Sequence, residues 1–517
     1  MTGSDIPEGE GPLSSAPQDS LLMKRLRDVV RAVRDSPDPL DSPVGIDFQP
    51  MSGPEHLELW RSRLARRDDG RPARIVLYVH VPFCAQVCSY CMFASTRLEA
   101  AADLDGYVEA LAREAALWGE GLDRPEVSTI HVGGGTPSLL SPDQIDRAFG
   151  ALRTAFPVAP GFRFGVEMHP ASTTRAKAEA LRRHGVDRVS LGVQSFRPEV
   201  LAAIGRRGQT ADRVASAVAV VREAGIPSVN LDLLAGLPGE TEESFADGIR
   251  QALALGTQTL TLNRYLVEGS PLAGAWESGP EAAAIADRML LAADRIIRAT
   301  RTPLSPPEAL RLPGYGTQYV FDRAEAARTF FQEDMIGPVP SLGLGFGALS
   351  HLPGQVFSTP SGTPGDYVRA LADGGLPGTV AARLSERFEW AWYVAELASR
   401  GVLQRAGFRD RFGVDLDACL GPEVEFLVRR RLLVEDRGRL NKVRHRRFTA
   451  IHLLSFLLAG PAEGPAGREF PAPADAVAAS RRQYDGILDE LPPSLVWCRI
   501  GLRAARAARC SGRRNRS

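Results

Sequence analysis

The sequence predicts an α/β fold in which the strands of a parallel sheet alternate with helices. From residue 75 onward, short runs rich in β-branched residues are separated by longer amphipathic segments. A strand–helix–strand order is typical of a parallel sheet, because parallel neighbours need a crossover connection. About six such units follow one another, which predicts a partial (β/α)6 barrel and not a closed eightfold one.

Each unit of the predicted barrel can be assigned from the sequence. The expected strands are residues 75–81, 129–132, 163–168, 188–193, 228–234 and 259–266. The expected helices are residues 104–118, 142–155, 174–184, 210–224 and 242–255, with one more at 281–299. Barrels of this kind bind ligands at the carboxyl ends of their strands, so we expect the functional residues there.

The rest of the chain is expected to surround this barrel with smaller parts. The predicted parts are a flexible start with a leader helix (1–72), the barrel (73–275), a post-barrel segment (276–384), a small helical or winged-helix domain (385–455) and an Arg-, Pro- and Ala-rich tail (456–517). The expected core of the winged-helix domain is Leu397, Leu403, Leu416 and Leu432.

Composition restricts the classes of partner. Lys plus Arg and Asp plus Glu both total 62, so the net charge gives no reason to expect nucleic acid or a membrane surface. No run approaches the roughly 20 apolar residues of a membrane-spanning helix, and residues 1–20 lack an apolar signal segment. We therefore expect a cytoplasmic, monomeric protein. Six cysteines are too few for a disulfide framework in 517 residues, which favours thiols kept for a metal.

The strongest motif is a C-x3-C-x2-C loop directly after the first predicted strand. Its thiols belong to Cys84, Cys88 and Cys91. Three thiolates can bind three irons of a [4Fe-4S] cluster and leave the fourth iron for another ligand. The amino and carboxylate groups of S-adenosylmethionine (SAM) suit that iron, and one electron then splits the molecule to a 5′-deoxyadenosyl radical. A structural zinc site is disfavoured, because no fourth Cys or His lies at the required spacing.

This loop and the motifs that follow resemble the radical SAM family that includes oxygen-independent coproporphyrinogen III oxidase. Relatives in that family include the heme chaperone and the class C methylases of natural-product biosynthesis, and the resemblance covers about residues 73–455. It implies a partial (β/α)6 barrel that binds one [4Fe-4S] cluster and two SAM molecules side by side. It also implies an electron donor such as flavodoxin or ferredoxin.

Some site residues are expected to bind the SAM at the cluster. The resemblance assigns Tyr78, before the cysteines, and Tyr90, between Cys88 and Cys91, to SAM binding. Gly134, Gly135 and Thr136 follow the second strand, where residues without Cβ allow the backbone to approach a ligand. Glu167 ends the third strand, and a carboxylate there can accept hydrogen bonds from both hydroxyls of a ribose. The neighbouring His169 is expected to be structural.

The remaining site residues are expected to bind the second SAM. Gln194 and Arg206 offer an amide and a guanidinium, and the latter can hold a carboxylate with two hydrogen bonds. The role of Arg206 is implied by the resemblance, because the bare sequence makes it and Arg207 surface cations. Asp232 follows on the fifth strand, and the resemblance places Leu266, after Tyr265, in the same pocket.

Two departures from the family decide between its activities. Coproporphyrinogen oxidases have another cysteine two residues after the third, where this chain has Phe93. The heme chaperones carry a His-containing heme motif, whereas residues 314–331 contain no His. The sequence therefore predicts transfer of a SAM-derived carbon, as a methyl or cyclopropane group, to an sp2 carbon of a small or carrier-bound substrate. The alternatives are a heme chaperone and an oxidative decarboxylase of a porphyrinogen.

Overall fold

The computed structural model describes the chain from Gln49 to Lys442 with interruptions. The described residues are 49–64, 70, 72–91, 93–99, 101–265, 280–300, 310–312, 316–321, 339–352, 356–383, 390, 393–394, 402–429, 433–436 and 438–442. The expected leader helix, Leu397, Leu432, Leu266 and the 456–517 tail lie outside them. Among the described residues, no helix has the length and apolar character needed to cross a membrane.

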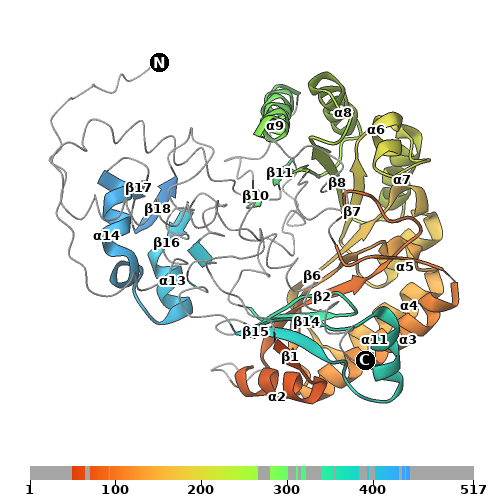
Figure 1. Cartoon of the computed structure of the whole chain (residues 1–517), viewed down its shortest axis with the longest axis vertical. Helices are drawn as coiled ribbons and strands as arrows, with labels where there is room; N and C mark the ends of the chain where they lie inside the picture. The colour runs from red at the N-terminus through yellow and green to blue at the C-terminus, as the bar shows by residue number, and fades with distance from the viewer. Residues whose placement is uncertain are drawn as a thin grey trace.

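Six parallel strands alternate along the chain with helices, which lie on the outer side of the strands (Figure 1). The strands, in both chain and spatial order, are β2 (Arg74–Val81), β5 (Glu126–Gly134), β6 (Val158–Met168), β7 (Arg188–Gln194), β8 (Ser228–Ala235) and β9 (Thr259–Arg264). The intervening helices are α3 (Ala101–Gly121), α4 (Pro142–Ala155), α5 (Arg175–Arg183), α6 (Pro198–Ala203), α7 (Ala211–Glu223) and α8 (Glu242–Ala254). The predicted (β/α)6 order is confirmed.

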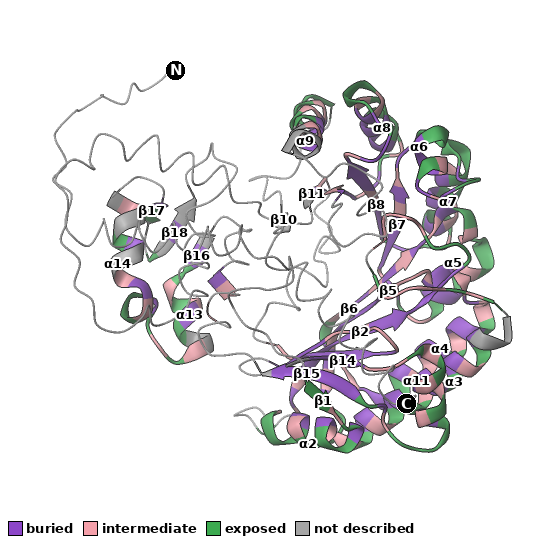
Figure 2. Cartoon of the chain, in the orientation of Figure 1, coloured by how far each residue is buried: buried purple, intermediate pink, exposed green. Residues whose placement is uncertain are grey.

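The strands hold together because both of their faces are buried. Figure 2 shows most of the strand residues buried, while the helices carry an exposed outer face. Ile75, Leu77 and Val79 of β2 have no exposed surface, and Val132, Leu191 and Leu231 continue the core through the neighbouring strands. Burial on both sides explains why these strands appear in the sequence as apolar runs.

Hydroxyl side chains fix where several of the helices begin. Ser141, Thr174, Thr210 and Thr241 each accept a hydrogen bond from a backbone amide of the following turn. An N-cap of this kind is worth about 1 kcal/mol. The caps account for the agreement between the predicted and observed starts of α4, α5, α7 and α8.

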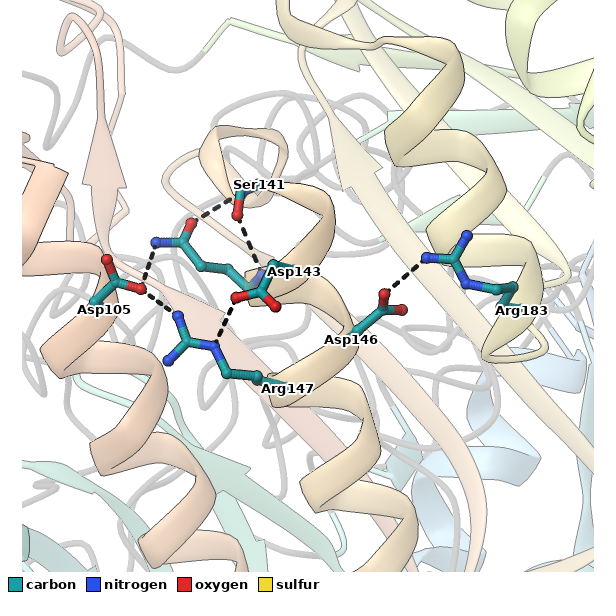
Figure 3. Close-up of polar contacts among 7 residues, drawn as sticks. Asp105, Ser141, Asp143, Asp146, Arg147 and Arg183 are labelled. Atoms are coloured by element: carbon teal, nitrogen blue, oxygen red, sulfur yellow. Dashed lines mark hydrogen bonds and ion pairs between the residues drawn. The ribbon is translucent and has the colours of Figure 1, made fainter.

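A polar network joins the outer helices α3, α4 and α5 (Figure 3). Asp105 accepts hydrogen bonds from Gln144 Nε2 at 3.1 Å and from Arg147. Asp146, next to Arg147 but on the opposite side of α4, pairs with Arg183 of α5 at 2.7 Å (Figure 3). These pairs are exposed, so each contributes under about 1 kcal/mol and the network serves mainly to align the helices.

The sheet extends beyond the six strands at both edges. At one edge, β12 (Ser341–Leu344) lies parallel to β2, and β13 (Ser350–Leu352), β14 (Val356–Pro360), β15 (Thr379–Arg383) and β1 (Gln49–Met51) continue it. At the other edge are β11 (Gly316–Val320) and β10 (Leu310–Leu312), both antiparallel. Helices α2 (Gly53–Arg63), α9 (Pro280–Thr300) and α11 (Pro364–Ala372) accompany these strands.

This extension modifies the predicted division of the chain. Residues 49–64, grouped from the sequence with a flexible start, form β1 and α2, and β1 pairs with β15. The post-barrel segment also adds strands to the same sheet as the barrel. Residue 275 is therefore not a boundary between two separate sheets.

The Gly-rich stretch of the post-barrel segment is anchored to α3. Glu114 Oε2 accepts hydrogen bonds from the Gly345 amide at 2.7 Å and from the Tyr367 hydroxyl at 2.6 Å. Burial raises the pKa of Glu114 to about 7. Tyr107 bridges the Phe346 amide and the His80 carbonyl at 2.9 and 2.7 Å. These contacts hold the stretch beside the end of β2.

The described part of the predicted winged-helix domain contains two helices and a small sheet. The elements are β16 (Val402–Gln404), α13 (Arg405–Phe412), α14 (Leu416–Arg429), β17 (Leu433–Asp436) and β18 (Arg439–Lys442). The three strands are antiparallel in the order β16-β18-β17. Leu403 and Leu416 are buried as predicted.

Candidate functional site

The three cysteines lie at the carboxyl end of β2. Cys84 ends the short strand β3 (Phe83–Cys84), which pairs with β4 (Thr96–Arg97) and thereby closes the loop on itself. Within the loop, the Cys91 amide donates to the Cys88 carbonyl at 3.1 Å. Cys84 is buried and the other two are half-buried, and none forms a disulfide. The loop thus presents three free thiols from one side of the barrel.

The thiols are close enough to influence one another. Burial raises the pKa of all three, that of Cys91 to about 11, and the charges of Cys84 and Cys88 contribute to the shift at Cys91. Cluster binding must therefore displace protons from these thiols. Among the described residues, no three His, Cys, Asp or Glu side chains converge on a position for a single metal ion. The donor set fits a cubane, in which each thiolate binds a different iron.

Hydroxyl and amide groups surround the thiols. Thr136 Oγ1 donates to Cys84 Sγ at 3.4 Å, which joins the loop to the turn after β5. The Ser95 side chain hydrogen-bonds to Cys84 and Cys91, and the Phe93 amide to Cys91. Such hydrogen bonds to the sulfurs favour the negative charge that a bound cluster carries.

The glycines after β5 allow a close approach between the turn and the cysteine loop. A Cβ on Gly135 would lie 2.7 Å from the Phe83 carbonyl oxygen and 2.9 Å from that of Val81. Gly134 has a φ of +106°, and a Cβ there would lie 2.7 Å from the His80 ring. Only glycine satisfies both positions, so the predicted turn is a steric requirement of this site.

Glu167 lies in a row of polar side chains across β2, β5 and β6. Its Oε1 is 3.0 Å from His131 Nε2, and its Oε2 is 2.9 Å from the Cβ position of Gly133. The Tyr78 ring stacks on His131, and its hydroxyl contacts His80 Nδ1 at 3.0 Å. His131 was not predicted from the sequence. Its spacing two residues before Gly133 puts both on one face of β5 and could have indicated it.

Arg206 is buried in the loop after α6, with only 8% of its surface exposed. Its Nη1 donates to the Tyr90 hydroxyl at 3.2 Å, and its Nε lies 3.2 Å from His169 Nε2. The expectation of a surface cation from the bare sequence is wrong, because the guanidinium points into the barrel end beside the cysteine loop. His169, left as structural, is part of the same group.

Gln194 reaches the same place from the end of β7. Its φ is +70°, a conformation that residues other than glycine rarely adopt, and it coincides with a shift in the pairing between β7 and β8. The Cβ position of Gly192 lies 2.9 Å from Gln194 Nε2 and 3.5 Å from Arg206 Nη2. The two predicted residues therefore lie together.

Asp232 lies on β8 within a polar layer of the barrel interior. Its Oδ1 accepts from Asn230 Nδ2 at 2.8 Å. Burial raises the pKa of Asp232 to about 6, the charge of Glu167 adds to the shift, and Arg188 opposes it. Arg188 was not identified from the sequence. Glu167, assigned to the first SAM, is thus near enough to Asp232, assigned to the second, to raise the pKa of Asp232. Tyr265 is buried after β9.

Part of the chain matches a known superfamily. Residues 78–252 match the radical SAM superfamily and form a domain of that kind. The expected cofactors, a [4Fe-4S] cluster and SAM, are those of this superfamily. The protein also resembles the solved coproporphyrinogen III oxidase (HemN) of Escherichia coli, with a TM-score of 0.64 and 22% identity over 80% of this chain and 94% of that one. This likeness confirms the fold.

Curated relatives match part of the chain. An oxygen-independent coproporphyrinogen III oxidase of Bradyrhizobium diazoefficiens is 37% identical over 225 residues, which is 43% of this chain and 48% of that protein. The heme chaperone HemW of Bacillus subtilis is 33% identical over 192 residues, 37% of this chain and 51% of that protein. The chain thus spans about half the length of the curated relatives it matches. These relatives do not support the narrower resemblance to class C methylases.

Proposed function

We propose that this chain binds a [4Fe-4S] cluster through Cys84, Cys88 and Cys91 and cleaves SAM reductively. The observation that carries the proposal is the position of three free thiols, at the end of β2 and joined to the glycine turn by the Thr136–Cys84 contact. When bound, the cluster supplies one electron to SAM and so generates a 5′-deoxyadenosyl radical.

The residues around the loop have distinct tasks in this proposal. The backbone of Gly134, Gly135 and Thr136 binds the amino-acid end of the SAM at the cluster, since nothing bulkier than glycine fits against β2. Glu167 binds the ribose. Its carboxylate is held by His131 and its side chain is 38% exposed, so one oxygen can turn toward a ligand. Tyr78 lies beside this pair.

A second SAM is proposed beside the first. Gln194, Arg206 and Asp232 would bind it, and Tyr90 of the cysteine loop accepts a hydrogen bond from Arg206. A guanidinium can hold a carboxylate with paired hydrogen bonds. Gln194 Nε2 and Arg206 Nη2 lie 2.9 and 3.5 Å from the Cβ position of Gly192, which supports a common site for these two side chains.

For the overall reaction, we place a porphyrinogen decarboxylation or a heme-handling role first. The names of the relatives support these functions, which the sequence analysis ranked second. Carbon transfer from SAM remains a second candidate. It is favoured by Phe93 at the position of the oxidases' additional cysteine and by the lack of His in residues 314–331.

One set of anaerobic reactions separates these candidates. Reconstituted protein with dithionite and SAM should form 5′-deoxyadenosine and methionine in every case. An oxidase would convert coproporphyrinogen III with loss of carbon dioxide, and a chaperone would bind heme stoichiometrically. A carbon-transfer enzyme given methyl-deuterated SAM would place deuterium in both 5′-deoxyadenosine and product. The absence of SAM cleavage under all of these conditions would contradict the proposal itself.

A further inference from the structure

Two N–H donors, one from Arg206 and one from the backbone, point at the imidazole of His169. His169 follows β6 directly, and Arg206 lies in the loop after α6. Arg206 Nε–H points at His169 Nε2 from 3.2 Å, while the Ala171 amide points at His169 Nδ1 from 3.1 Å. A neutral imidazole has one acceptor nitrogen and one N–H, so it can accept only one of these two donors.

The surrounding backbone decides which nitrogen accepts. His169 caps the short helix η2 (Pro170–Ser172), and its own amide donates to Ser138 Oγ at 2.9 Å. The His169 carbonyl accepts from Thr173 Oγ1 at 3.0 Å. The imidazole is thus fixed relative to the Ala171 amide, whereas Arg206 has a long side chain that can turn. Nδ1 is the acceptor, and Nε2 carries the proton.

The end of the barrel therefore presents a cluster of hydrogen-bond donors. With this tautomer, the Arg206 Nε–H and the His169 Nε2–H face each other across 3.2 Å with no acceptor between them, and Arg206 Nη1 donates to the Tyr90 hydroxyl at 3.2 Å. Tyr90 hydrogen-bonds in turn to Cys88. Donors that converge without an acceptor between them fit a carboxylate, which accepts from several N–H groups at once.

We propose that His169 Nε2–H and the Arg206 guanidinium bind one ligand carboxylate together. The inference rests on the proposed function. The carboxylate is either that of the second SAM or a carboxylate of the acceptor substrate, such as a propionate of a porphyrinogen. His169 gives direction and not charge, because burial and the nearby Arg206 and Arg213 lower its pKa to about 3. Arg206 supplies the charge.

Two substitutions separate the role of the His169 Nε2–H donor from that of His169 Nδ1, which caps η2. In His169→Asn, the side-chain oxygen takes the place of Nδ1 and keeps the contact to the Ala171 amide, but the Nε2 donor is lost. In His169→Gln, the amide nitrogen lies near the position of Nε2 and restores a donor. His184→Asn is the matched control, since His184 lies on the outer side of the barrel and contacts Asp146 at 2.9 Å.

The assay is equilibrium binding to the reconstituted, unreduced protein. The probes are S-adenosylhomocysteine and 5′-methylthioadenosine, which lacks the amino-acid carboxylate, and coproporphyrin III and its tetramethyl ester. His169→Asn should weaken S-adenosylhomocysteine at one of two sites about ten- to a hundredfold and leave 5′-methylthioadenosine unchanged. His169→Gln should restore much of the affinity. If only coproporphyrin III weakens, and its ester does not, the carboxylate belongs to the acceptor.

Two results would overturn the inference. One is an equal loss for ligands with and without a carboxylate, which would make His169 structural. The other is unchanged affinity for every probe in His169→Asn, including the case in which the wild type binds a single S-adenosylhomocysteine and no porphyrin. Wild-type SAM cleavage, measured separately with dithionite, shows whether the proposed function itself has failed.

Discussion

Gly135→Ala tests the packing of the glycine turn on the cysteine loop. The new Cβ would lie 2.7 Å from the Phe83 carbonyl oxygen and 2.9 Å from that of Val81, and both neighbours are backbone. Backbone atoms cannot turn away as a side-chain end can, so β2 and β5 must separate at the end where the Gly135 amide donates to Val81 at 2.8 Å. Cys84 follows Phe83 directly, and its contact with Thr136 would lengthen.

The cost of this overpacking is about 1–3 kcal/mol. For a domain of this size, that corresponds to a fall in Tm of roughly 3–9 °C. We expect Gly135→Ala to lower Tm by this amount and to bind less iron per chain after reconstitution, measured by thermal unfolding and by iron analysis. Gly106→Ala is the control, because nothing lies within 4 Å of its Cβ position and alanine favours the α3 helix. A Gly135→Ala protein with the Tm and iron content of the wild type would refute the reasoning.

Three further predictions concern Glu114, the two proposed SAM sites and the fate of the SAM methyl group. Burial raises the pKa of Glu114 to about 7, above the unfolded value near 4.5. Between these two values the Glu114 carboxyl is protonated in the folded state and ionised in the unfolded state, so the free energy of unfolding falls as the pH rises through this range. Glu114→Gln removes this effect. In denaturant titrations, the free energy of unfolding of the variant minus that of the wild type should rise by about 3 kcal/mol from pH 4.5 to 7. A difference that does not change with pH would contradict this prediction. Arg206→Ala should weaken the second SAM about ten- to a hundredfold while 5′-deoxyadenosine formation survives better than in Glu167→Ala, and equal losses in both variants would favour a single SAM. With methyl-deuterated SAM, a porphyrinogen oxidase should leave the product unlabelled, whereas mass spectrometry of a carbon-transfer product would show the label.

The alternation of strands and helices could be predicted because β2, β5, β7, β8 and β9 carry buried residues on both faces, whereas β6 alternates buried and half-buried residues. Such strands appear as apolar runs, and hydroxyl caps mark where α4, α5, α7 and α8 begin. The extension of the sheet could not be predicted. β12 has four residues and pairs with β2, which is far away in the sequence, so no local pattern indicates the partner. Glu114 likewise binds Gly345, 231 positions along the chain.

Some residues of the site could likewise be predicted from the sequence, and others could not. The three cysteines lie within one short loop, and their spacing alone predicted the cluster ligands. Arg206 appeared as a surface cation beside Arg207, and only the turn of the chain after α6 brings it to Tyr90 and His169. His131 of β5 lies 3.0 Å from Glu167, and Arg188 of β7 acts electrostatically on Asp232; the sequence offered a signal for His131, its spacing before Gly133, but none for Arg188.

The most direct test of the account is iron and SAM cleavage in single cysteine variants. Wild-type protein, reconstituted without oxygen, should hold about four irons per chain and form 5′-deoxyadenosine only with a reductant. Cys84→Ala, Cys88→Ala and Cys91→Ala should each lose the electron paramagnetic resonance signal of a reduced [4Fe-4S] cluster together with SAM cleavage, while Cys419→Ala keeps both. A variant lacking all three loop cysteines that still holds a full cluster and cleaves SAM would contradict the central claim.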